Sequence, residues 1–150
     1  MRFMVLHKAD QRTEAGDMPD EKMLAEMGRY NEELVKAGVL LAGEGLQPTS
    51  RSARVRFSGD ERTVVAGPFG ETERLIAGYW IFRCSSLQEA IDWVKRCPNL
   101  LGGKLEIEIR PIYEAADFGE AFTPELQRAE ERMRKQIEAR QTRQPGGVLT

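Results

Sequence analysis

Two short apolar runs constrain the fold of this chain more than any other feature of its sequence. Phe3-Met4-Val5-Leu6 and Tyr79-Trp80-Ile81-Phe82 are apolar at every position, so as strands they place apolar side chains on both faces of a sheet. The sequence also predicts two amphipathic helices for that sheet, and two helices can cover only one of its faces. A second copy of the same sheet is the simplest cover for the other face. The sequence therefore predicts a homodimer.

The other elements follow from periodicity and from start and stop signals. A helix is expected from Pro19-Asp20-Glu21, because proline and carboxylates suit the first helical turn, to Gly38. Ser86-Leu87-Gln88-Glu89 fits a capping box that opens a second helix, with Leu87 facing inward. In chain order the expected elements are a strand at 2–7, a loop at 10–17, a helix at 19–38, a strand at 39–42, a hairpin at 53–65, a strand at 78–82, a helix at 86–97 and a strand at 105–110.

This order predicts an α+β fold of the ferredoxin-like kind, β-α-β-(hairpin)-β-α-β, assembled as a dimeric α+β barrel. We expect this domain to occupy residues 1–122, followed by a C-terminal extension at 123–150. The extension contains a charged helix from Thr123 to about Arg140, which is expected to lie across the body or the partner subunit. Residues 144–147 predict a frayed end.

Composition excludes several classes of function. Twenty-two basic and 24 acidic side chains give a net charge of −2, which argues against a nucleic-acid surface. The sequence has neither a membrane-spanning run nor the pattern of a signal peptide, so a cytoplasmic protein is expected. Cys84, Cys97 and the lone His7 cannot build a zinc site of the usual kind, and no cofactor is expected. Both cysteines are expected to be reduced thiols.

Four blocks of sequence carry a resemblance to a known family. They are LAGEGLQPTS (41–50), VAGPFGETERLIAGYWIF (65–82), AIDWVKRCPN (90–99) and IEIRPIYEAADFGEAFTPEL (107–126). Together they resemble the YCII-related family in its DGPF-containing branch, over about residues 1–126. The resemblance implies a dimeric α+β barrel in which two ferredoxin-like sheets pack face to face.

The chain departs from that family at its namesake tetrad. Ala66 stands where the family has aspartate, so the tetrad is Ala-Gly-Pro-Phe, and Gly70 replaces the alanine that usually follows. The resemblance implies a fold shared with small cofactor-free isomerases, oxygenases and dehydratases, and an association of DGPF members with sigma factors. Some branches are thought to use a His-Asp pair, but no aspartate of this sequence can be matched to it.

His7 and Glu44 are the candidate catalytic residues. Glu44 follows an apolar run and lies between two glycines, which allow a ligand to approach; a buried carboxylate there could be a general acid or base. His7 ends the first strand and is the only imidazole, so it could carry a proton near neutral pH. The plainer interpretations are a carboxylate that fixes the strand end and a polar cap whose hydrogen bonds are satisfied.

The candidate ligand-binding residues are Pro68, Phe69, Glu71, Thr72, Tyr79 and Trp80. The first four belong to a Gly-Pro turn, which could be only a turn or could also border a cleft. Tyr79 and Trp80 lie on opposite faces of their strand, so one of them is expected to face the cleft.

Two classes of function remain open. One is a small cofactor-independent enzyme, of lyase, isomerase or hydrolase type, acting on a small organic molecule. The other is a ligand-binding or regulatory partner protein without turnover. Ala66 in place of the family aspartate slightly favours the second class, or else an enzyme with a divergent substrate.

Overall fold

A computed structural model describes residues 1–143 of the chain, and the frayed end predicted at 144–147 lies outside them. The core of the fold is a four-stranded antiparallel sheet. Its strands are β1 (Arg2–Lys8), β2 (Leu40–Gly45), β5 (Ile76–Arg83) and β6 (Ile107–Pro111), in the spatial order β2-β5-β1-β6. This order is the ferredoxin-like one, so the predicted α+β fold class is confirmed. The dimeric assembly stays a prediction.

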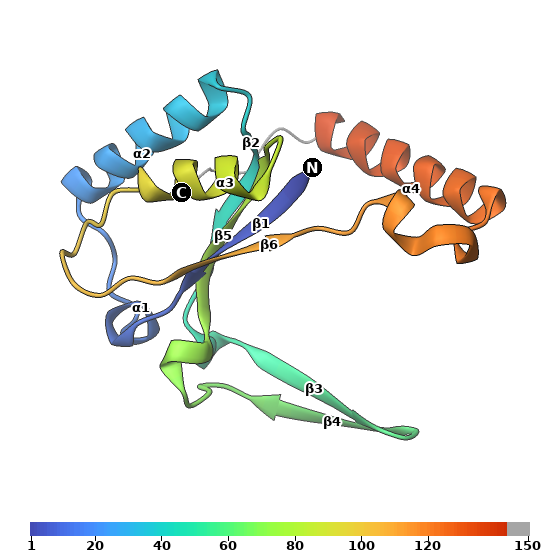
Figure 1. The fold of residues 1–150 in the computed structure, drawn as a ribbon. Coiled ribbons are helices and arrows are strands. Elements are labelled where there is room, and N and C mark those ends of the chain that lie inside the picture. The colour runs from blue at the N-terminus through green and yellow to red at the C-terminus, as the bar shows by residue number, and fades with distance from the viewer. Residues whose placement is uncertain (144–150) are drawn as a thin grey trace.

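Two helices cover one face of the sheet (Figure 1). Helix α2 (Glu21–Lys36) begins after Asp20, whose carboxylate accepts a hydrogen bond from the Met23 amide at 2.8 Å. Helix α3 (Leu87–Lys95) begins after Ser86, which caps it in the same way. The core between these helices and the sheet contains Phe3, Val5, Tyr30, Leu34, Val39, Trp80, Phe82, Cys84 and Ala90.

The strand register decides which side chains face the helices. Partners across neighbouring strands share a face, and Leu6 is paired with Tyr79 while Met4 is paired with Ile81. These four residues alternate with the core residues of the same strands, so they lie on the face opposite α2 and α3. Trp80 faces the helices, and Tyr79 faces away from them. The expectation that these two aromatic residues lie on opposite faces is confirmed.

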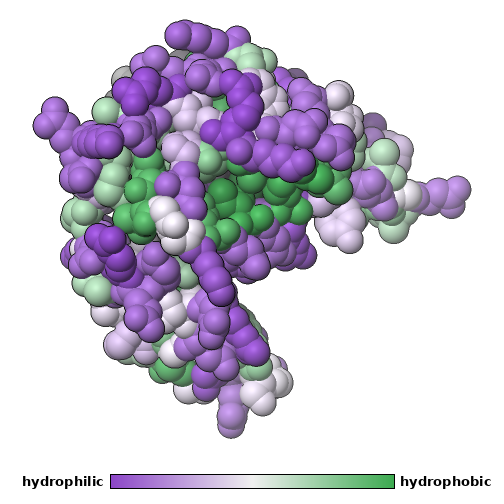
Figure 2. Space-filling model, turned by 60° about the vertical axis from the view of Figure 1, so that its left-hand side comes forward, coloured by the Kyte–Doolittle hydropathy of each residue, from purple (hydrophilic) through white to green (hydrophobic). Residues whose placement is uncertain are grey.

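A two-stranded hairpin projects from the sheet (Figure 1). It is formed by β3 (Ala53–Ser58) and β4 (Glu61–Ala66), with every residue exposed except Val65, which is partly buried. In the space-filling view, a band of hydrophobic side chains lies in the hollow between the main body and this lower arm (Figure 2). A hairpin with so little burial contributes little stability by itself.

The C-terminal segment forms a separate arm beyond the end of β6 (Figure 1). It consists of a 3₁₀ segment, η3 (Ala115–Ala121), and helix α4 (Pro124–Arg143). The predicted C-terminal helix is therefore confirmed, but it extends away from the sheet instead of crossing the body of its own chain. Among the described helices, none is both long enough and apolar enough to cross a bilayer.

Two local predictions are wrong. A short helix, α1 (Gln11–Ala15), replaces the expected loop, because Asp10 and Thr13 form a reciprocal cap: each side chain bonds the other's backbone amide. In the usual capping box, serine or threonine is the cap and a glutamate or glutamine three residues later bonds back to it; here aspartate is the cap and threonine bonds back. Leu87 is 44% exposed instead of facing inward, since it is the first residue of α3 and does not pack on the sheet.

Candidate functional site

A pocket of about 440 Å³ lies between the first half of α2, the short helix α1 and the ends of strands β2 and β5. Its volume falls in the range of small-molecule sites. His7 and Trp80 border it from the helix-bearing side of the sheet, while Glu44 and Tyr79 belong to the opposite side. Its lining consists of His7, Thr13, Gly16, Asp17, Met18, Pro19, Met23, Leu24, Met27, Glu44, Gly45, Leu46, Gln47, Pro48, Ala77, Gly78, Tyr79, Trp80 and Leu100.

His7 forms part of the wall, near the end of β1. Its neighbour across the sheet is Gly78, which has no side chain to cover the imidazole. The His7 and Trp80 rings meet edge to face, with centroids 4.5 Å apart. Among the described residues, no group hydrogen-bonds the buried Nε2 of His7. Burial lowers the pKa of His7 from its ordinary value of 6.5 to about 4, so the ring is neutral at pH 7.

Trp80 connects the pocket to the core. Only 4% of its surface is exposed, and its ring contacts those of Tyr30 and Phe82 as well as His7. The ring lies across β2 at Gly43, where an added Cβ would come within 2.4 Å of the indole Cδ1. Glycine at position 43 is therefore required for Trp80 to hold its place in the pocket wall.

Replacing Gly43 by alanine is expected to lower the free energy of unfolding by about 1–3 kcal/mol, because the new methyl group overpacks against Trp80. Gly28→Ala is the matched control: a Cβ at this position in α2 meets nothing within 4 Å, so it should stabilise the helix by about 0.5–1 kcal/mol. Urea unfolding measures both. Equal effects of the same sign would contradict the assigned contact.

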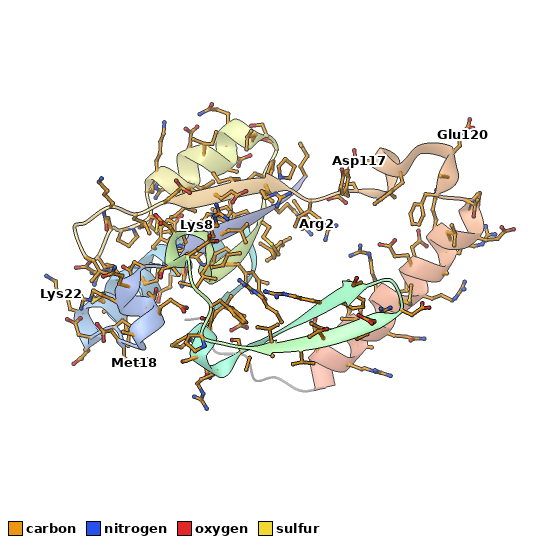
Figure 3. All side chains as sticks on the ribbon, turned by 90° about the horizontal axis from the view of Figure 1, so that it is seen from below. Arg2, Lys8, Met18, Lys22, Asp117 and Glu120 are labelled. Atoms are coloured by element: carbon orange, nitrogen blue, oxygen red, sulfur yellow. The ribbon has the colours of Figure 1, made fainter. Side chains whose placement is uncertain are left out.

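Methionine and leucine side chains form the rest of the wall. Met23 and Met27 extend from α2, while Met18, Leu24 and Leu46 are exposed around the opening. Figure 3 shows Met18 at the end of the molecule where α1 meets α2. Methionine side chains adapt to differently shaped ligands, so the pocket suits an apolar molecule more than one particular outline.

Few polar groups reach the pocket. Thr13, Asp17 and Gln47 border it, but none of the described residues forms a hydrogen bond with the imidazole of His7. Within residues 1–143, no three His, Cys, Asp or Glu side chains gather in a way that could hold a metal ion. Within this part of the chain, His7 therefore contributes an unpartnered polar atom to apolar surroundings, although this Nε2 is itself buried.

Glu44 and Tyr79 border the same pocket from the ends of their strands. They are paired across β2 and β5, which puts both side chains on the face opposite Trp80. Glu44 is exposed. Of the sequence-derived candidates, the structure thus brings His7, Glu44, Tyr79 and Trp80 to one pocket, with His7 and Trp80 on its helix side.

The other four candidates lie outside the pocket, in the loop between the hairpin and β5. Phe69 lies under the guanidinium of Arg54, with the Cζ atom 3.8 Å from the ring centroid. Glu71 pairs with Arg74 at 3.0 Å. Pro68 and Thr72 occupy the same bend, and neither borders the pocket. The loop closes against backbone: a Cβ at Gly67 would lie 1.7 Å from the carbonyl oxygen of Thr49.

Thr49 ties this loop to α1. Its hydroxyl donates to Glu14 Oε2 at 2.6 Å and accepts from the Phe69 amide at 3.0 Å, while its own amide donates to Glu14 Oε1 at 3.2 Å. Three segments distant in sequence therefore meet at one side chain.

Thr49→Val is expected to lower the free energy of unfolding by about 1–3 kcal/mol, because it leaves the Phe69 amide and the Glu14 carboxylate without their hydroxyl partner. Thr49→Ser keeps the hydroxyl and should remain close to the wild type. Denaturant unfolding of the two variants gives the comparison, and equal losses would show that the hydroxyl is not the cause.

The sequence interpretation missed most of the apolar wall. None of Met18, Met23, Met27 and Leu46 was among the candidate site residues. A signal was present: three of the chain's six methionines fall within residues 18–27. Such clustering marks adaptable surfaces, although a helix stripe alone does not distinguish a core from a pocket.

Comparison with known proteins finds similarity to a curated protein, a solved structure and a family model. The uncharacterized protein R00369 of Rhizobium meliloti (strain 1021) is 32% identical over 93 residues, which are 62% of this chain and 75% of that protein. Among solved structures, 5-chloro-2-hydroxyhydroquinone dehydrochlorinase (TftG) from Burkholderia phenoliruptrix AC1100, in complex with 2,5-dihydroxybenzoquinone, is similar with a TM-score of 0.44 and 15% identity. That similarity covers 76% of this chain and 95% of TftG. The model of the YCII-related domain matches residues 1–116, and this chain therefore belongs to the YCII-related family.

Proposed function

We propose that the protein takes a small, largely apolar organic molecule with one hydroxyl or carbonyl group into this pocket, and that His7 exchanges a proton with it without a cofactor. The observation that carries the proposal is the buried, neutral imidazole whose Nε2 has no partner among the described residues. A buried polar atom without a hydrogen bond is costly, and a catalytic or binding role is one of the explanations for such an atom. A ligand hydroxyl can satisfy either tautomer of the ring, since it both donates and accepts.

A second candidate, binding without turnover, is favoured by the low pKa itself. A base with a pKa of about 4 takes up a proton poorly at neutral pH, whereas an efficient catalytic base has a pKa near the working pH. The same pocket would then only hold its ligand, as in a regulatory partner protein. Binding and turnover therefore need separate measurements.

Binding is tested with phenol and its 4-methyl, 4-ethyl and 4-propyl derivatives, alongside ethylbenzene, which lacks the hydroxyl. Affinity should rise about fourfold for each added CH₂, because burying one contributes about 0.8 kcal/mol. His7→Gln should weaken the preference for 4-ethylphenol over ethylbenzene while leaving the dependence on alkyl length. Equal affinity of these two ligands for the wild type would refute the role of His7 in binding.

Turnover is tested with a ketone probe. We expect the wild type to accelerate exchange of the α-hydrogens of cyclohexanone in D₂O, as followed by NMR, and His7→Gln to lose that acceleration. Glu44→Gln tests whether the exposed carboxylate at the pocket border shares the proton transfer. If the wild type binds the phenols but exchanges the hydrogens of cyclohexanone no faster than His7→Gln does, the catalytic function is excluded and the binding function remains.

The second face of the sheet supports a further part of the proposal, a homodimer. Met4, Tyr79 and Ile81 place partly exposed apolar surface on the side without α2 and α3. Packing against a second copy would bury these side chains and close the expected barrel. Sedimentation at equal concentrations should show a smaller or more weakly associated assembly for Ile81→Glu than for the wild type.

We also infer that the chain belongs to the DGPF-containing branch, in spite of Ala66. That residue ends β4, is exposed, and is paired with Ala53 outside the pocket. Its replacement of the family aspartate therefore leaves the lining of this pocket unchanged.

A further inference from the structure

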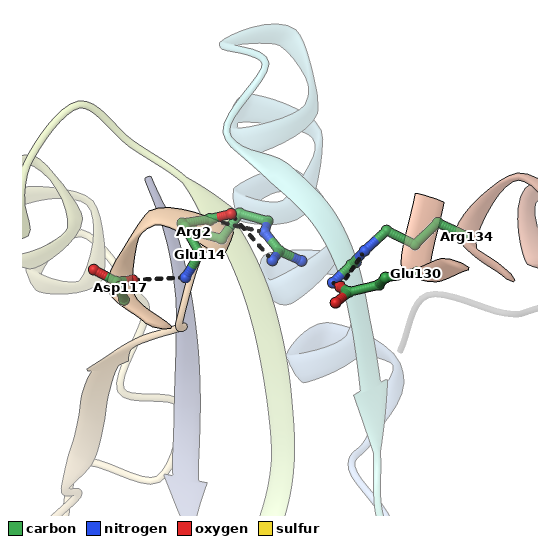
Figure 4. Close-up of polar contacts among 5 residues, drawn as sticks. All are labelled: Arg2, Glu114, Asp117, Glu130 and Arg134. Atoms are coloured by element: carbon green, nitrogen blue, oxygen red, sulfur yellow. Dashed lines mark hydrogen bonds and ion pairs between the residues drawn. The ribbon is translucent and has the colours of Figure 1, made fainter. Parts of the chain in front are cut away.

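Helix α4 lies outside the part of the chain that the family model matches, which ends at residue 116. The arm that carries it is fixed to the sheet at its base (Figure 4). There the Arg2 guanidinium donates to Glu114 Oε1 at 3.1 Å, and the Glu114 amide donates to Asp117 at 2.7 Å. The helix itself extends free of the body, so the domain does not pack against its surface (Figure 1).

An apolar stripe runs along α4 without a partner. Leu126, Met133 and Ile137 are 52%, 56% and 54% exposed, and their spacing of seven and four residues puts them on one side of the helix. Ala129 falls on the same side. None of residues 124–142 is buried. A helix gains most of its stability by packing an apolar face, and among the described residues of a single chain the apolar face of α4 lacks that packing.

The stripe is not the side that meets the rest of the arm. A small hollow between η3 and α4 is lined from the helix by Gln127, Glu130, Glu131 and Arg134. Glu130 and Arg134 are also bound to each other along the helix, as Figure 4 shows. At 100° per residue, this side lies about a quarter turn from the stripe. The stripe therefore stays open to another molecule.

The charges of α4 are divided between its two halves. In residues 124–131 three carboxylates oppose one arginine, which gives −2; in residues 132–142 four cations oppose one carboxylate, which gives +3. Two such helices side by side and parallel would place like charges together. Antiparallel, each acidic half lies beside the partner's basic half, which is the complementary arrangement.

The apolar residues support the same orientation. In an antiparallel pair whose centre lies between positions 131 and 132, Leu126 of one helix faces Ile137 of the other, and Met133 lies opposite Glu130, next to Ala129. Leucine and isoleucine side chains then meet at both ends of the pair. We propose that α4 pairs antiparallel with α4 of a second copy of this chain, through the stripe of Leu126, Ala129, Met133 and Ile137.

Disulfide crosslinking of the full chain tests this pairing and its direction. Leu126→Cys and Ile137→Cys proteins, each oxidised alone, should stay uncrosslinked, while their equal mixture should give a mixed disulfide-linked dimer as the main product. Lys135→Cys, on the opposite side of the helix, should crosslink with neither. Helices in contact bring facing Cα atoms within the reach of a disulfide.

Each outcome decides the proposal. Crosslinking of Leu126→Cys with itself would indicate a parallel pair and overturn it, as would equal crosslinking of Lys135→Cys or no crosslinking at all. Introducing Met133→Glu into both cysteine proteins should abolish the mixed disulfide, because it puts a carboxylate into the apolar seam. The readout reports contact between the helices, so it is independent of whether the sheets dimerise.

Discussion

Trp80→Ala is expected to lower the free energy of unfolding by about 3–5 kcal/mol, as large-to-small changes of buried aromatic residues do. The side chain is 4% exposed and contacts the rings of His7, Tyr30 and Phe82, so its loss opens a cavity that the sheet cannot close. The same substitution removes one wall of the pocket. Urea unfolding at pH 7 provides the measurement.

Trp80→Phe is the control for this prediction. It keeps an aromatic ring in the core, so the loss of stability should be smaller than with alanine. It also admits water to the His7 side of the pocket, and the pKa of His7 should then move from about 4 back toward 6.5. A loss below about 1 kcal/mol for Trp80→Ala would mean that the site relaxes around the missing ring.

The second large effect is a pH dependence of stability that arises from His7. Burial lowers its pKa in the folded protein to about 4, while the unfolded chain has the ordinary value of 6.5. Between these values the unfolded chain binds more protons, so stability is complete above pH 6.5 and falls as the pH falls toward 4. The full difference is about 3 kcal/mol.

His7→Gln removes this dependence, and the difference between the two proteins isolates it. Carboxylates whose pKa values are lowered by hydrogen bonds, such as those of Asp10 and Glu114, also lose stability in acid, but equally in both proteins. Denaturant unfolding at several pH values from 7 to 4 gives the curves. If the free energy of unfolding falls equally with pH in the wild type and in His7→Gln, His7 is hydrated in the folded protein. Since the chain has one histidine, its imidazole NMR signal gives the pKa independently.

The fold was predictable because its signals are local. Runs such as Phe3–Leu6 define buried strands by themselves, and the caps and glycines define the helix ends within one turn. The exception, α1, depends on a reciprocal bond between Asp10 and Thr13, a variant of a known motif with other residues in it. Its misassignment as a loop comes from the unusual residues and not from tertiary packing.

The site was predictable only in part, because its geometry depends on contacts between distant segments. His7 and Glu44 were chosen at strand ends, Tyr79 and Trp80 as aromatic residues on opposite faces of a strand, and all four border one pocket. The Gly-Pro-Phe loop was chosen on the general tendency of loops to carry sites, yet it is directed elsewhere by the bond between Thr49 and Phe69. No local pattern announces a contact with a residue 20 positions away.

The bond between Thr49 and Glu14 has a consequence for how this protein can change in evolution. Glu14 belongs to α1, the helix that supplies Thr13 to the pocket wall, and Thr49 follows Pro48, which lines the same wall. A substitution in the Gly-Pro-Phe loop therefore shifts the wall through its neighbours, without touching the ligand. Selection for a new ligand could act on that loop, and among relatives positions 14, 49 and 69 should vary together with the residues that line the pocket.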